Sequence, residues 1–323
     1  MVNYVDSISI PGGGTNLAQA ASNTFERQHS ASRSFSKARR QGTLPGIPSS
    51  GGAPFLKWAG GKGQLLTQLD SYFPKKFNRY FEPFAGSAAV FFHLGKIVSG
   101  LKATLIDTNE ELINCFTVVR DQFEDLVPKL QSYQEQHGET FYYKMRGNVP
   151  TELGSVERAA RFIYLNKTCY NGLYRVNRKG IFNVPIGSYS NPKIFDEDNL
   201  RAASIALEKA KLIHGHFSAV LKQASDGDFV YFDPPYYTET NGFTGYAVSA
   251  TGKAGFGAFD HRMLLNCVEK LNERGCTVVI SNSNTKFIRD LYENFTRDKV
   301  TARRFINCNG SGRQLVHELV ITN

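Results

Sequence analysis

The stretch NRYFEPFAGSAAVFFHLGKI, residues 78–97, together with LKATLID at 101–107, indicates the fold class of this chain. Its first apolar run predicts a strand, and Gly86 then permits a tight turn. The apolar stretch after the turn predicts a helix, and 101–107 predicts a second strand. A strand, a turn, a helix and a strand in this order form a Rossmann-like unit, so we expect an α/β fold.

The rest of the chain predicts a larger sheet with an insert. Residues 110–165 are mainly helical in pattern, and 199–213 predict a helix that runs into a strand at 211–215. The remaining expected elements are strands at 228–232, 276–282 and 317–323 and a helix at 260–275. The sheet is therefore interrupted after its second strand by a helical and loop-rich insert at 110–198, a natural place for substrate selection.

Composition narrows the class of protein. The 323 residues include 38 basic and 29 acidic side chains, a net charge of +9 that favours a polyanionic partner. No run of about 18 apolar residues and no secretory signal occurs, so neither a membrane span nor secretion is expected. The five cysteines are scattered and form no CxxC pair, which fits reduced thiols in a cytoplasm and predicts no disulfide framework or zinc site.

Residues 1–53 differ from the rest of the chain. They are rich in Gly, Ser, Ala, Thr and Pro, and ASRSFSKARR at 31–40 is basic without any acid. This composition predicts a disordered basic tail. A tail that contacts DNA phosphates and an organellar transit peptide are the alternatives.

The sequence DPPY at 233–236 is the most specific signal for chemistry. It follows an apolar strand, and strand ends in open α/β sheets face the ligand crevice. Adenine's exocyclic amine is a poor nucleophile because its lone pair is delocalised into the ring. The Asp233 carboxylate and the Pro234 carbonyl can accept its two hydrogens, while both prolines fix the backbone and Tyr236 can stack on the base. The alternative is a proline-rich turn in which Asp233 caps a helix.

Two further segments indicate a ligand that contains adenosine. Gly86 permits close approach of a ligand at a strand–helix turn, and Asp107 ends the next strand about 20 residues later, where an acid can bind two ribose hydroxyls. The full GxGxxG of a nicotinamide dinucleotide site is missing. FLKWAGGKGQLL at 55–66 is not a triphosphate-binding loop, because Leu56 stands where its first glycine is required.

The insert contains a basic stretch. From Arg158 to Phe195 there are seven basic residues and no acid, with aromatic residues and glycines between them. This pattern is typical of a surface that contacts phosphates and base edges, although a solvated basic face would look similar.

Two shorter patterns, a histidine pair and a glycine-rich segment, each allow more than one interpretation. HGH at 214–216 places His214 and His216 on one strand face, where without a third ligand we expect packing or polar contacts rather than a metal site. The glycine-rich segment 242–259 is either a loop that closes over a bound base or a plain flexible loop.

Taken together, these segments resemble a known family, the Dam-type DNA adenine methyltransferases, or α-class N6-adenine enzymes. Seven blocks occur in the family's order and spacing over about residues 54–322: FLKWAGGK, EPFAGS, LIDTN, YLNKTCYNGLYRVNRKGIFNVPIG, FDPPY, ISNSNT and NGSGR. The resemblance implies a Rossmann-like S-adenosylmethionine-dependent methyltransferase sheet with an inserted, mainly helical target-recognition domain. It implies a catalytic domain at 54–109 and 199–323, a target-recognition domain at 110–198 and the tail at 1–53 outside both.

The resemblance also implies roles for individual residues. Binding of the donor S-adenosylmethionine is implied for Trp58, Lys62, Phe84, Gly86, Asp107 and Asp233. The catalytic residues, which hold a flipped adenine, are implied to be Asp233, Pro234, Pro235 and Tyr236. DNA binding is implied for Asn171, Leu173, Arg175, Arg178, Lys179 and Pro185, of which Leu173, Arg175 and Pro185 match positions that read the site in GATC methyltransferases. No metal ligand is implied.

Two departures from the family stand out. Ala88 occupies a position where relatives usually carry a second glycine, so we expect altered packing near the methionine end of the donor rather than lost binding. The loop at 250–257 is longer than is usual in the family, so we expect its contacts to differ from those of close relatives.

The expected activity is methylation of adenine N6 in double-stranded DNA, within GATC or a related short palindrome, with S-adenosylhomocysteine as the product. We expect a monomer or weak dimer with no obligatory metal, in the cytoplasm of a bacterial or phage-infected cell and associated with the nucleoid. Whether it has a restriction partner is left open. The alternatives are methylation of cytosine's amine or of RNA, and a decayed, non-catalytic DNA-binding protein, against which the intact DPPY and donor blocks speak.

Overall fold

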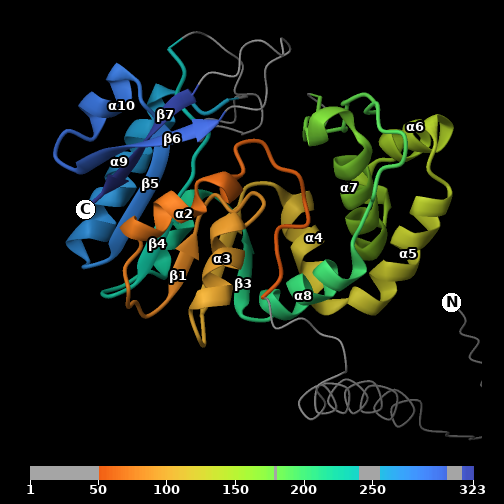
Figure 1. The fold of residues 1–323 in the computed structure, drawn as a ribbon, viewed down its shortest axis with the longest axis horizontal. Helices are drawn as coiled ribbons and strands as arrows, with labels where there is room; N and C mark the ends of the chain where they lie inside the picture. The colour runs from red at the N-terminus through yellow and green to blue at the C-terminus, as the bar shows by residue number, and fades with distance from the viewer. Residues whose placement is uncertain (1–50, 178–179, 240–254, 304–314) are drawn as a thin grey trace, which may run out of the picture. The chain divides into compact units, whose positions relative to one another are not determined.

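The computed structural model describes residues 51–177, 180–239, 255–303 and 315–323, and all of them belong to one compact unit that spans Pro48–Asn323. Its centre is a seven-stranded sheet (Figure 1) with the order β3-β2-β1-β4-β5-β7-β6. The strands are β1 (Tyr80–Glu82), β2 (Ala103–Asp107), β3 (Ala210–His214), β4 (Phe229–Phe232), β5 (Thr277–Ser283), β6 (Thr296–Arg303) and β7 (Leu315–Thr322). Strands β1 to β5 are parallel, and β7 runs antiparallel between β5 and β6. The expected α/β fold is confirmed.

The central strands are buried on both faces because their apolar side chains alternate between two cores. In β4, Phe229 and Tyr231 enter one hydrophobic core and Val230 and Phe232 enter the other. Successive side chains of a strand point to opposite faces, so a sheet covered on both sides needs apolar residues at every position. This requirement explains the continuous apolar run FVYF.

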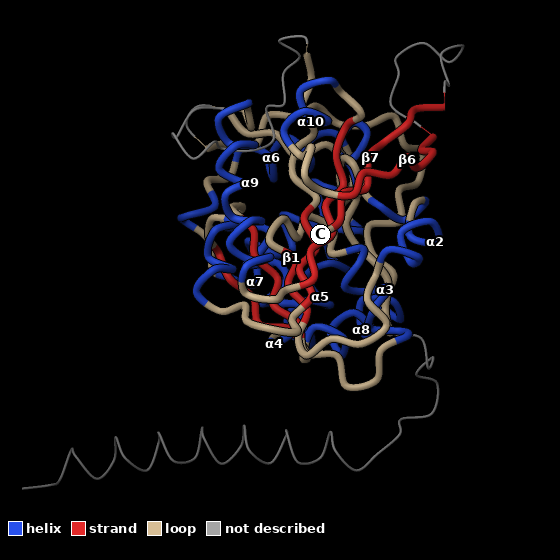
Figure 2. The backbone as a smooth tube through the Cα atoms, turned by 90° about the vertical axis from the view of Figure 1, so that its left-hand side faces the viewer, coloured by secondary structure: helices blue, strands red, loops and turns tan. Residues whose placement is uncertain are grey.

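Helices cover both faces of this sheet, as Figure 2 shows from a second direction. The helices are α2 (Leu66–Leu69), α3 (Ala89–Ile97), α4 (Glu110–Asp121), α5 (Phe123–Glu135), α6 (Glu139–Gly147), α7 (Ser155–Thr168), α8 (Glu197–Leu207), α9 (Ala258–Glu273) and α10 (Lys286–Leu291). Apolar residues of α3, α4 and α8 share one core with the insert helices, whereas α9 and α10 contribute to the other. None of the described helices is long and apolar enough to cross a membrane.

The helical insert is packed onto the sheet rather than tethered to it. Helix α4 contacts β2, β3 and α8 as well as α7. On α7, Arg158 forms ion pairs with Glu110 and Glu111 of α4, the first at 2.8 Å. The hydrophobic core therefore continues from the sheet into the segment at 110–198.

Two sequence expectations require correction. His214 ends β3, but His216 lies beyond the strand and caps the 3₁₀ helix η5 (Phe217–Lys222), so the two histidines do not share a strand face. The sequence did not predict the edge strand β6 or the short helix α10. The ends of the other strands lie within two residues of the expected ends. Strand β1 is shorter than the apolar run that predicted it.

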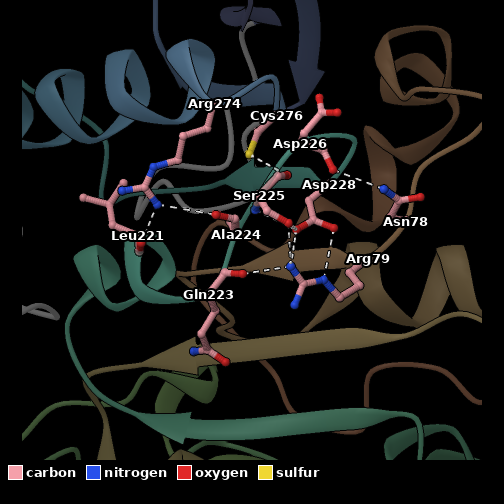
Figure 3. Close-up of polar contacts among 10 residues, drawn as sticks. All are labelled: Asn78, Arg79, Leu221, Gln223, Ala224, Ser225, Asp226, Asp228, Arg274 and Cys276. Atoms are coloured by element: carbon pink, nitrogen blue, oxygen red, sulfur yellow. Dashed lines mark hydrogen bonds and ion pairs between the residues drawn. The ribbon is translucent and has the colours of Figure 1, made fainter.

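A polar cluster fixes the amino end of β4 next to β1 (Figure 3). The Arg79 guanidinium donates to both carboxylate oxygens of Asp228, at 3.1 and 2.6 Å, and to the Gln223 carbonyl at 2.8 Å. Asp228 is 1% exposed and also accepts the backbone N–H of Ser225 at 2.9 Å. Such a charge-assisted, two-pronged contact holds the strand register on which the opposite end of β4 depends.

We predict that Asp228→Ala lowers the free energy of unfolding by about 2–4 kcal/mol, because it leaves the Arg79 and Ser225 donors without their acceptor. Asp226→Ala is the matched control, since the Asp226 side chain is exposed and only its carbonyl accepts a bond, from Asn78. Urea unfolding followed by circular dichroism measures both. Equal stability of the two variants would contradict a clamp at this position.

Candidate active site

The topology predicts a ligand site at the carboxyl ends of β1 and β4. These strands are neighbours, yet the chain continues from β1 toward β2 and β3 on one side and from β4 toward β5 on the other. Ligands of open α/β sheets bind at such a switch point. Glu82 ends β1, Asp107 ends β2, Asp233 follows β4, and Glu318 of β7 pairs with Ser283 at the end of β5.

A buried ion pair occupies the centre of this edge. Lys62 Nζ lies 2.7 Å from Asp233 Oδ1, and the two side chains are 5% and 21% exposed. The same ammonium donates to the Gly60 carbonyl at 2.8 Å and lies 4.9 Å from the centre of the Tyr236 ring. Lys62 is thus almost fully buried beside Asp233, whose side chain stays partly exposed.

Burial and Lys62 shift the pKa of Asp233 in opposite directions. Burial raises the pKa of the Asp233 carboxyl, the Lys62 charge and hydrogen bond lower it, and the nearby Glu318 raises it. A carboxylate in this balance can accept hydrogen bonds and also take up a proton when one is released beside it.

The DPPY turn is held by side chains of β5 and β7. The Tyr236 hydroxyl donates to Glu318 Oε2 at 2.6 Å. The Tyr237 backbone N–H donates to Asn282 Oδ1 at 3.3 Å, and its carbonyl accepts from the Ser283 hydroxyl at 2.7 Å. Pro234 is buried and Pro235 is half-buried within this turn. The direction of the Tyr236 ring is therefore set before any ligand binds.

Glu82 is a buried carboxyl that sequence analysis did not single out. It is 3% exposed, and its Oε2 accepts from the Tyr80 hydroxyl at 2.9 Å and from the Phe91 N–H at 3.0 Å. Burial raises the pKa of Glu82 to about 8, with a further contribution from the charge of Asp233. The electrostatic link to Asp233 follows from the β1–β4 pairing, which the sequence alone does not reveal.

The turn after β1 connects Trp58, Gly86 and Asp107. Gly86 has φ +48°, and a Cβ at this position would lie 2.8 Å from Trp58 Cδ1, so both its backbone angle and its contact with the indole require glycine. Asp107 Oδ2 accepts the Gly86 N–H at 3.0 Å, and Oδ1 accepts the Asn109 N–H at 2.9 Å. Burial raises the pKa of Asp107, and these two bonds oppose the shift.

Phe84 and Ala88 complete this turn. Phe84 packs on Phe217, Phe232 and Phe256 with ring centres 5.3, 6.3 and 5.6 Å away. Ala88 is fully buried and left-handed, with φ 54°, where an L-residue with a Cβ is strained. The strain explains why a glycine, which relatives usually carry at the position of Ala88, would suit this backbone conformation better.

The expected DNA-binding residues gather on the insert. Asn171, Arg175 and Pro185 are exposed and Leu173 is half-buried. The Tyr170 N–H donates to the Pro185 carbonyl at 2.9 Å, and Arg175 Nε donates to Asn183 Oδ1 at 2.7 Å. The chain thus brings 170–175 and 183–185 together, while Arg178 and Lys179 lie outside the described residues. We use the name recognition segment for residues 170–185.

Lys57 is a cation that sequence analysis did not assign to this surface. Its Nζ lies 4.1 Å from the centre of the exposed Tyr189 ring, and its amide donates to Asn166 Oδ1 at 2.8 Å. A Cβ on Gly172 would lie 2.5 Å from its stem, so Lys57 packs on the recognition segment. In the sequence, the place of Lys57 next to Trp58 in the FLKWAGGK block indicated that it lies near the site.

Comparison with known proteins identifies the family. The sequence model described as D12 class N6 adenine-specific DNA methyltransferase matches residues 58–306. The chain belongs to this family.

Curated relatives agree with this assignment. The chain is 43% identical to the type II methyltransferase M.MjaIII of Methanocaldococcus jannaschii, over 84% of this chain and 98% of that protein. It is 39% identical to the type II methyltransferase M1.LlaDCHI of Lactococcus lactis, covering 84% and 95%, and 34% identical to a DNA adenine methylase of Haemophilus influenzae, covering 83% and 92%. The expected family resemblance is confirmed, and the protein is an adenine-specific DNA methyltransferase.

We predict a characteristic pH dependence for Glu82 of this methyltransferase. Between pH 4.5 and about 8 the unfolded chain releases the Glu82 proton and the folded chain keeps it, so the residue's contribution to stability falls as pH rises. Glu82→Gln should therefore gain a few kcal/mol of unfolding free energy relative to wild type between pH 5 and pH 9. Chemical unfolding at both pH values measures the difference, with the exposed Glu293→Gln as control. A difference independent of pH would refute the raised pKa.

Proposed function

We propose that this methyltransferase transfers a methyl group from S-adenosylmethionine to N6 of an adenine that is flipped out of double-stranded DNA, within GATC or a related short palindrome. The observation that carries the proposal is the Lys62–Asp233 pair, a partly open carboxylate fixed at the switch point and followed by Pro-Pro-Tyr. S-adenosylhomocysteine is the product.

The residues at the carboxyl ends of β1 and β2 have the chemistry that this donor requires. The Asp107 carboxylate oxygens each accept one backbone N–H, which leaves acceptor capacity for ribose hydroxyls. Phe84 and Trp58 offer apolar surface to the adenine of the donor. Gly86 forms the turn that permits close approach of the ligand. Lys62 and Asp233 offer opposite charges to the amino and carboxylate groups of its methionine end. When bound, S-adenosylmethionine supplies an electrophilic methyl group on a sulfonium sulfur.

Asp233 and Pro234 activate the target amine in this proposal. The Asp233 carboxylate and the Pro234 carbonyl accept the two amine hydrogens, which keeps the lone pair of N6 out of the ring. Pro234 and Pro235 fix the backbone angles of both acceptors. A carboxylate oxygen of Asp233 receives the proton that the amine releases after transfer. Alignment of two bound reactants lowers a barrier by about 7–11 kcal/mol, so no covalent enzyme intermediate is required.

Tyr236 supplies a surface for the flipped base. Extrusion of a base costs a few kcal/mol, and stacking on an aromatic ring returns about 1–3 kcal/mol. The bond from the Tyr236 hydroxyl to Glu318 fixes the ring in advance, so little rotamer freedom is lost on binding.

The insert provides target recognition in this account. We propose that residues 54–109 and 199–323 form the catalytic domain and 110–198 the target-recognition domain. The expected tail at 1–53 lies outside the described residues, apart from 51–53. Leu173, Arg175 and Pro185 read the bases, and Asn171, Arg178 and Lys179 contact the backbone. The Asn183 contacts pre-orient Arg175, whose guanidinium suits two bonds to a guanine edge. The enzyme acts as a monomer or weak dimer and requires no metal.

We predict that Asp233→Asn lowers kcat by at least about 10²-fold, because the amide cannot take up the proton and accepts more weakly. Its Kd for the target duplex should stay within a few-fold of wild type. Transfer of tritiated methyl groups to DNA measures the rate, and fluorescence anisotropy measures binding. Glu239→Gln, an exposed carboxylate in the same segment, is the control. Undiminished turnover of Asp233→Asn would overturn the catalytic assignment.

A second prediction concerns Arg175→Lys, which keeps the charge but loses the planar fork of donors. The variant should discriminate less between the preferred site and duplexes with a single base changed. We expect the loss of about 1–3 kcal/mol of discrimination at one base pair of the site. Competition between duplexes with single substitutions measures this, and Arg120→Lys on α4, which pairs with Asp121, is the control. Selectivity equal to that of wild type would remove Arg175 from base reading.

A further inference from the structure

Tyr174 is the residue of the recognition segment that packs against Trp58, one of the residues proposed to bind the donor. Its ring stacks on the Trp58 indole, with ring centres 6.1 Å apart and an angle of 17° between the planes. Trp58 in turn packs so closely on Gly86 that a Cβ there would lie 2.8 Å from the indole. A single side chain therefore separates Tyr174 from the strand–helix turn proposed to approach the methyl donor.

The opposite side of Tyr174 belongs to the insert. Its ring centre lies 5.2 Å from that of Phe162 on α7 and 5.8 Å from that of Phe182 in the recognition segment. Leu173 and Arg175 are its direct neighbours in the chain, and Arg175 is held by Asn183. Tyr174 cannot shift without moving the two residues that are proposed to read bases.

We propose that Tyr174 is a positioning residue that couples binding of the methyl donor to reading of the DNA site. The proposal rests on the function proposed above. A donor that contacts Trp58 fixes Tyr174 through the ring stack, and so orders Leu173 and Arg175 for the target. Coupling between two sites is reciprocal, so the target duplex strengthens donor binding by the same factor. Non-target DNA, which lacks the base contacts, produces a smaller effect.

The test measures this factor in the full-length protein. The Kd of S-adenosylhomocysteine, an unreactive probe, is determined by calorimetry with and without a saturating duplex that contains the site methylated by wild type. The wild-type ratio of the two Kd values is expected to be about tenfold. Tyr174→Leu should reduce it to below about twofold, whereas Tyr174→Phe, which keeps the ring and its stack on Trp58, should keep the wild-type ratio. Tyr143→Leu, the same change at an exposed aromatic residue of α6, should leave it unchanged.

The ratio distinguishes coupling from a merely structural role. A structural defect weakens both Kd values or lowers the melting temperature and leaves their ratio intact, so thermal unfolding is measured for each variant. A wild-type ratio of one, or the wild-type ratio in folded Tyr174→Leu, would overturn the proposal. If the leucine variant does not fold, amide hydrogen exchange of the wild type decides, and unchanged protection at 173–175 on addition of S-adenosylhomocysteine refutes coupling. A failure of the proposed function is recognised separately, because wild type would then not methylate DNA.

Discussion

The ion pair between Lys62 and Asp233 organises the catalytic edge of the sheet. Lys62 comes from the segment before β1 and Asp233 from the end of β4, so the pair exists only when these strands are neighbours. An almost fully buried ammonium is costly without a partner, and the partner here is the carboxylate of Asp233, the proposed catalytic residue. Burial and the nearby Glu318 raise the pKa of Asp233, and the charges of Asp233 and Lys62 shift the pKa of Glu82 in opposite directions. Formation of the sheet and of the active site are thus one event.

The second organising feature is the continuity of the core from the sheet into the insert. A recognition segment on a loosely attached domain would lose the precise distance to the catalytic carboxylate. Here α4 and α7 pack together, and Trp58 packs on Phe162 and Tyr174. Aromatic contacts of this kind combine large buried area with few rotatable bonds, so they transmit position well. This continuity supports the proposal that bases are read by the insert while a methyl group is transferred at the edge of the sheet.

Much of the fold could be predicted from the sequence, for a definite physical reason. Strands buried on both faces give continuous apolar runs such as FVYF, which are easy to recognise. Strand β6 was missed because among the residues at 296–301 only Val300 is buried, and an edge strand needs little apolar character. The roles of DPPY and of the turn at Gly86 could also be predicted from the sequence. Those of Glu82, Glu318 and Tyr174 could not, because their significance arises from strand order and from contacts between distant segments.

Sequencing of DNA methylated by the purified protein with isotopically labelled S-adenosylmethionine tests the account. We expect the label at N6 of adenine, in one short palindromic site such as GATC, on double-stranded substrate. Label on the amine of cytosine, label spread over adenines without regard to sequence, or no transfer to DNA would contradict it.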